Sequence, residues 1–178
     1  MKYNRIAVKE LRLQLSHRDC NVTTGPGVYR WWFPKTMALQ LLKPLKGVDN
    51  SRILKEKIGG KEYWCLYFGI SKDLRQRAKW HTMQKHSASA VKSGFLSTLR
   101  RTITALLGID ASKSEQQVND VMDLAYWDWC ATPTHDEAKL IETKTLAAGY
   151  FPLNVQENKG VDPSVVQQLK QLRKAYKK

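Results

Sequence analysis

The sequence has few of the features that would mark a secreted, metal-clustered or membrane-embedded protein. Its three cysteines are far apart and form no Cys-x-x-Cys spacing, which argues against both a disulfide scaffold and a zinc site. No apolar run approaches the length of about 20 residues that crosses a membrane. The first five residues begin no signal-peptide pattern. We therefore expect a cytoplasmic protein that does not enter the membrane.

Acidic residues are scarce relative to basic ones. Sixteen Asp and Glu stand against thirty Lys and Arg, so the formal net charge is +14 and the sequence pI is about 9.8. A surface this positive attracts polyanions, of which nucleic acid is the commonest. A merely soluble basic protein or an anionic-membrane binder would share this charge, but no amphipathic anchor stands out. The composition favours a nucleic-acid partner.

The pattern of strands and helices predicts one α+β domain over residues 1–178. Aromatic and β-branched residues indicate strands at 27–33, 63–69 and 124–132, which predict a small, three-stranded, mostly antiparallel sheet flanked by helices. Thr134 and Glu137 form a T-x-x-E capping box at the start of one helix. Helical spacing or helix-end signals predict helices at 8–15, 37–45, 52–58, 71–81, 91–107, 116–122, 134–148 and 162–178, the last one basic.

Two polar side chains lie on the apolar side of the helix predicted at 71–81. Arg77 and His81 are four positions apart and share that side with Leu74 and Ala78. An unpaired buried charge is costly, so both side chains need partners. A phosphate would satisfy both. A core carboxylate and a backbone carbonyl would serve equally well.

Glu142 repeats this anomaly on the helix predicted at 134–148, where it lies on the side of Ala138, Ile141 and Leu146. An inward glutamate either pairs with a buried cation, such as Arg77, or binds a metal ion. Mg²⁺ prefers oxygen ligands and is often held by one or two carboxylates with water and substrate phosphate. This helix alone leaves the two interpretations open.

Two of the predicted strands contain Gly27-Val28-Tyr29 and Tyr67-Phe68-Gly69, and these are followed along the chain by Arg77, His81, Glu142 and Asn154. Taken in order, these positions resemble the residue set of the GIY-YIG nucleases. In that family two short strands each present a tyrosine beside a helical arginine. The resemblance extends over about 27–154. The region 137–154 is similar to excision-repair incision subunits, and the helix at 71–81 to phage homing endonucleases.

The resemblance implies a metal-dependent site that hydrolyses DNA phosphodiesters, with RNA not excluded as a substrate. Glu142 would bind the divalent ion, Mg²⁺ or Mn²⁺, and Arg77 would contact the scissile phosphate. Tyr29 would orient or deprotonate the attacking water with assistance from His81. Tyr67 would bond to the phosphate or to that water. Asn154 would be a supporting polar residue.

The long segment between the two tyrosines departs from a compact family member. This insertion covers about 34–62, within a core of about 25–156, and is rich in lysine. It would serve as a DNA-recognition element, a dimer contact or a decorated loop. The residues that we expect to contact nucleic acid are Arg30, Lys72, Lys85, His86, Lys92 and Arg100.

Three functional hypotheses follow from the sequence. The first is a Mg²⁺-dependent DNA endonuclease, and the second is a non-catalytic nucleic-acid-binding module on the same scaffold. The third is an interaction domain, which an inward salt bridge between Glu142 and Arg77 would favour. In that case the tryptophans would pack a core or a partner surface: Trp31, Trp32, Trp64, Trp80, Trp127 and Trp129.

Overall fold

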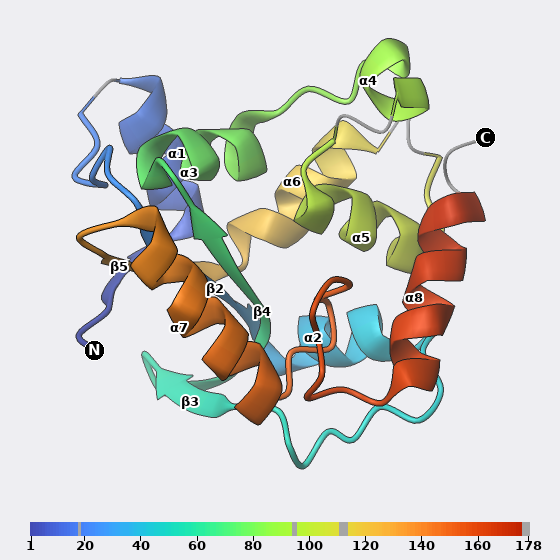
Figure 1. The fold of residues 1–178 in the computed structure, drawn as a ribbon. Coiled ribbons are helices and arrows are strands. Elements are labelled where there is room, and N and C mark those ends of the chain that lie inside the picture. The colour runs from blue at the N-terminus through green and yellow to red at the C-terminus, as the bar shows by residue number, and fades with distance from the viewer. Residues whose placement is uncertain (18, 94–95, 111–113, 176–178) are drawn as a thin grey trace.

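A single antiparallel sheet organises the molecule (Figure 1). The computed structural model describes residues 1–17, 19–93, 96–110 and 114–175, with only the backbone at 88, 91 and 92. The sheet has five strands in the order β1-β5-β2-β4-β3. Its strands are β1 (Asn4–Ala7), β2 (Gly27–Pro34), β3 (Lys55–Ile58), β4 (Lys61–Ser71) and β5 (Tyr126–Ala131).

The expectation of three strands was correct for the centre of the sheet and wrong for its edges. The predicted strands correspond to β2, β4 and β5, whereas β1 and β3 were missed. Both edge strands are four residues long, and β3 is largely exposed. Such short, polar segments lack the apolar alternation that identifies a strand. The helix expected at 52–58 is wrong, because this segment instead pairs with β4.

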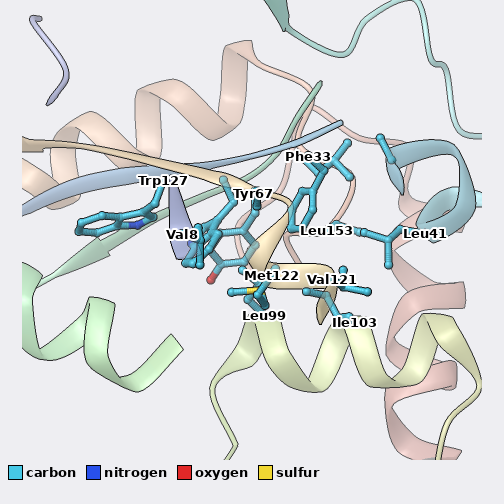
Figure 2. Packing of buried hydrophobic residues seen from close by; sticks show 14 of the residues in the cluster. Val8, Phe33, Leu41, Tyr67, Leu99, Ile103, Val121, Met122, Trp127 and Leu153 are labelled. Carbon is cyan, nitrogen blue, oxygen red and sulfur yellow. The ribbon is translucent and has the colours of Figure 1, made fainter. Parts of the chain in front are cut away.

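Helices cover both faces of the sheet. On one face α7 packs through Ala138 and Leu146 against Val28 and Phe68. The other face, which carries Tyr29 and Trp31, packs against most of the remaining helices; Figure 2 shows part of this larger core. The helices are α1 (Val8–Ser16), α2 (Lys35–Leu42), α3 (Leu74–Met83), α4 (Ala88–Ser93), α5 (Thr98–Leu107), α6 (Glu115–Asp123), α7 (His135–Ala148) and α8 (Pro163–Ala175).

Side-chain caps set the start of the helices that matter for the site. The Thr134 hydroxyl accepts a hydrogen bond from the Glu137 N–H, which confirms the predicted capping interaction at α7. At α3 the cap is Asp73, not Ser71 as expected. The single helix expected at 91–107 is divided into α4 and α5, because Ser97 caps a new helix start.

The strand β4 carries a bulge next to Tyr67. Trp31 pairs with Tyr67 while the next residue, Trp32, pairs with Cys65, so Leu66 has no partner on β2. As a result Leu66 and Tyr67 both face the larger core, and the strict alternation of faces is interrupted. The bulge therefore turns Tyr67 toward the face that already carries Tyr29.

The insertion at 34–62 is integrated into the domain. Leu41, Leu45 and Ile53 are buried in the larger core. The backbone of Lys46 also exchanges two hydrogen bonds with the Gln168 side chain of α8, at 2.8 and 3.0 Å. The insertion therefore supports the C-terminal helix.

The three cysteines are free thiols, and two of them are buried. No helix in the described part of the chain is long and apolar enough to cross a membrane.

Candidate active site

A cavity of about 810 Å³ lies between β4, the first part of α5, the middle of α7 and the C-terminal half of α8. It brings together three of the residues expected to form the site: Tyr67, Glu142 and Asn154. Tyr29, Arg77 and His81 do not line it. The remaining lining residues are Thr98, Arg101, Val155, Gln156, Glu157, Lys170 and Arg173.

Glu142 extends into this cavity from α7 without a protein partner. Its carboxylate accepts no hydrogen bond and forms no ion pair within 4.0 Å with any described residue, Arg77 included. Burial raises the pKa of Glu142 to about 7, and the charge of Glu157 adds to this while Arg77 opposes it. The salt bridge that would have favoured an interaction domain is thus not formed.

This donor set fits a divalent cation. A half-buried carboxylate with no protein cation bound to it is stabilised when a metal ion replaces its proton. The described residues contain no group of three or more His, Cys, Asp or Glu side chains suited to a metal. Mg²⁺ fits such a site, because it keeps several waters and uses few protein ligands beside substrate phosphates. Glu142 would hold the ion, and Glu157 is the second carboxylate in the same cavity.

Three positively charged side chains line the same cavity as Glu142. They are Arg101 on α5 and Lys170 and Arg173 on α8. The sequence interpretation missed all three as site residues. A signal was present for Arg173, because it follows the buried Val165 and Leu169 at spacings of four and so lies on the inner stripe of α8.

Tyr29 and His81 form a buried pair behind the cavity. The Tyr29 Oη and His81 Nε2 atoms are hydrogen-bonded at 3.0 Å, and His81 Nδ1 lies 3.1 Å from the Ser97 Oγ. Burial, Arg77 and Arg100 all lower the pKa of His81 well below its ordinary value, so the imidazole is neutral at pH 7. When the proton is on Nδ1, His81 donates to Ser97, and Nε2 accepts from the phenol.

Tyr67 links this pair to the cavity. Its ring lies 6.3 Å from that of Tyr29, centroid to centroid, at an interplanar angle of 26°. Burial raises the pKa of both phenols, and the charge of Arg77 opposes this shift in each. Figure 2 shows Tyr67 among the residues of the larger core, with Leu99 nearby.

Arg77 lies in another cleft, but its charge acts on four titratable groups of the site. Its guanidinium stacks over Trp80 at 5.1 Å, and it lines a cleft of about 410 Å³ that also contains Lys72 and His135. Its charge shifts the pKa of Tyr29, Tyr67, His81 and Glu142. A charge has such an effect only over short distances, so Arg77 is the cation common to these four groups.

Asn154 holds the free edge of β4 beside Tyr67. Its Oδ1 accepts from the Phe68 N–H at 2.9 Å, and its Nδ2 donates to the Phe68 carbonyl at 2.7 Å. The Leu153 N–H donates in the same way to the Leu66 carbonyl. Asn154 therefore continues the ladder of the sheet with its side chain, and both of its amide groups are engaged.

The expected nucleic-acid contacts divide into two groups. Lys72 and Lys85 are exposed, whereas the side chain of Lys92 lies outside the described residues. The other three are paired or buried, and none of the five with a described side chain lines the cavity. Arg30 pairs with Asp128 at 2.7 Å on the opposite face of the sheet. Arg100 is fully buried and donates to His86, which is itself buried.

The described site thus combines, on an α+β domain, a buried Tyr–His pair, an arginine that acts on its neighbours and a carboxylate without a protein partner. The model of the GIY-YIG catalytic domain matches residues 27–175, so the chain belongs to the GIY-YIG family. This domain indicates a nuclease-type function and a nucleic-acid substrate. Comparison with curated proteins gives no match, and comparison with solved structures gives none either.

Proposed function

We propose that this protein is a divalent-metal-dependent endonuclease that hydrolyses DNA phosphodiester bonds. The observation that carries the proposal is the environment of Glu142, a partly desolvated carboxylate without a protein partner in a cavity that also carries Arg101, Lys170 and Arg173. Such a cavity suits a metal ion together with the phosphates of a nucleic-acid strand. The net charge of +14 favours the same polyanion.

In this proposal Glu142 holds Mg²⁺ or Mn²⁺ through its carboxylate. When bound, the ion would supply Lewis-acid stabilisation of the phosphoryl oxygen and the leaving group. Arg77 binds the non-bridging oxygens of the scissile phosphate and offsets the charge that develops on them. Its effect on four neighbouring groups supports this central role.

Tyr29 and His81 accept the proton of the attacking water. With Nδ1–H donating to Ser97, the Nε2 atom is free to accept the Tyr29 proton while the phenol oxygen accepts a proton from water. Tyr67, which faces the cavity, bonds to the phosphate or to the water and positions it against Tyr29. Asn154 acts through the β4 backbone and supports the position of Tyr67.

The test compares plasmid cleavage by the wild type, Glu142→Gln and Glu137→Gln. Glu137 is an exposed carboxylate on the same helix and lies outside the cavity, so it provides a matched control. We expect supercoiled plasmid to be nicked or linearised with Mg²⁺ and protected by EDTA. Glu142→Gln should lose about 100-fold or more in rate, because the metal contributes several kcal/mol. Glu137→Gln should cleave like the wild type.

A second readout separates metal binding from catalysis. At pH 8, Mg²⁺ should raise the melting temperature of the wild type but not that of Glu142→Gln, because only the wild type offers the carboxylate. Equal cleavage by wild type and Glu142→Gln would overturn the assigned site. Salt-sensitive DNA binding without cleavage under any divalent metal would instead support the non-catalytic binding module.

A further inference from the structure

The C-terminal helix α8 places an arginine directly against one from α5. Val165 and Leu169 anchor α8 in the larger core, and Arg173 follows one turn later on the same stripe. The guanidinium of Arg101 donates to the backbone carbonyl of Arg173 at 3.3 Å. Both side chains line the cavity that contains Glu142, together with Lys170.

This arginine pair has no acidic partner among the described residues. Burial lowers the pKa of Arg101 and of Arg173, and in Arg173 the neighbouring Arg101 lowers it further. The Nε atom of Arg173 is buried and has no hydrogen-bond partner in the described structure. Two half-buried like charges with free donors are unfavourable unless an anion is bound between them.

Tyr67 relates this pair to the proposed scissile phosphate. Its side chain lines the main cavity together with Arg173, whereas Arg77 lines a separate cleft. The charges of Arg77 and Arg173 both oppose the effect of burial on the Tyr67 pKa. Arg77 and Arg173 are therefore two distinct cationic positions that both act on Tyr67.

We propose that Arg173, Arg101 and Lys170 bind a phosphate of the DNA strand next to the scissile one, which makes α8 part of the substrate-binding site. The inference rests on the proposed function and adds a second phosphate subsite to it. Guanidinium groups suit this role, since their planar donors bind phosphate oxygens in pairs. The cavity that holds the subsite also holds Glu142, so one strand can engage both.

The experiment measures DNA affinity in EDTA, where cleavage cannot interfere. The affinity of the wild type, Arg173→Gln and Lys174→Gln for a labelled DNA duplex is measured between about 50 and 200 mM NaCl. We expect Arg173→Gln to bind about tenfold more weakly and to reduce the slope of log K against log salt by about 0.9, the value for one lost phosphate contact. Lys174→Gln removes the same charge from an exposed position of the same helix, outside the cavity, and should change both quantities much less.

Two further measurements separate loss of the fold from loss of the charge. Arg173→Gln keeps the backbone carbonyl that accepts from Arg101 and removes a like charge, so its melting temperature should equal or exceed that of the wild type. Arg173→Lys should retain the salt slope but recover only part of the affinity, because the fork of donors is lost. Equal affinity and slope in Arg173→Gln and Lys174→Gln would overturn the subsite. Weaker binding by Arg173→Gln in a protein that never cleaves DNA would retain the subsite and reject the endonuclease.

Discussion

At the scale of single residues, the two glycines of the tyrosine strands are required by close approach. A Cβ at Gly27 would lie 2.4 Å from the Cys130 carbonyl oxygen, and one at Gly69 would lie 2.6 Å from the Tyr29 Cζ and Oη atoms. Real Cβ contacts are longer than this, so neither position accepts a side chain without a shift. Gly69 therefore provides the space in which the Tyr29 phenol reaches His81. The glycine of one motif and the tyrosine of the other therefore belong to one packing arrangement, which also brings the Tyr29 phenol to His81.

Substituting Gly69 should damage both stability and activity. Tyr29 is 2% exposed and bonded to His81, so it cannot yield to the new methyl group in Gly69→Ala without breaking that contact. We expect a loss of about 1–3 kcal/mol in the free energy of unfolding and a fall in cleavage rate. Gly25→Ala is the control, because a Cβ there meets nothing within 4 Å. Thermal melts and plasmid cleavage check the pair, and unchanged behaviour of Gly69→Ala would contradict the packing argument.

At the scale of elements, the sequence predicted what periodicity and capping encode. The central strands and α7 were correct, because apolar runs and the Thr134–Glu137 cap are local signals. The bulge at Leu66 was not predicted, since it depends on pairing between strands distant in sequence. The break before Ser97 was missed although its cap, Ser97 accepting from the Arg100 N–H, is also a local signal. The residues of the site were predicted from the resemblance to the GIY-YIG nucleases. Its separation into a cavity, a buried pair and a side cleft required the fold.

Asn154 shows how a loop element sustains a strand. Its side chain satisfies both backbone groups of Phe68 at an edge that β3 is too short to cover. Asn154→Ala should leave a buried donor and acceptor without partners and cost about 2 kcal/mol or more. Hydrogen exchange at the Phe68 amide should accelerate in this variant but not in Asn50→Ala, which alters an exposed asparagine. Unchanged protection of Phe68 would mean that another group holds this edge.

At the scale of the whole molecule, the net charge of +14 is distributed over other residues than those expected from the sequence to contact nucleic acid. Arg30 and Arg100 are bound to other side chains of the protein, whereas Arg101 and Arg173 line the same cavity. Helical periodicity identifies an inner face but not what that face meets. Only the return of α8 against α5 brings its arginine to the cavity that contains Glu142. The basic C-terminal helix is thus part of the site in space although it lies last in the chain.

The partial burial of Glu142 predicts how stability depends on pH. The pKa of Glu142 is about 7 in the folded protein against an ordinary value of 4.5, so the folded state holds this proton more tightly than the unfolded chain. Stability from this group is therefore present below about pH 4.5 and is lost as the pH rises through 7. Glu142→Gln cannot lose a proton and should melt higher than the wild type at pH 8. The difference should be small, on the order of 2 °C, because solvent screens a half-exposed carboxyl.

The measurement is a thermal melt of both proteins without metal at pH 4 and pH 8. At pH 4 the two should differ much less, since Glu142 is protonated in the folded and unfolded states. Glu157→Gln provides a second control: it removes the charge that helps to raise the pKa of Glu142 in the folded state, so the pH-dependent loss should be smaller and should end at a lower pH. A gap between wild type and Glu142→Gln that is independent of pH would show that the substitution acts through packing. The carboxylate would then be solvated well enough to ionise normally, and its affinity for a metal would have to come from the substrate phosphate instead.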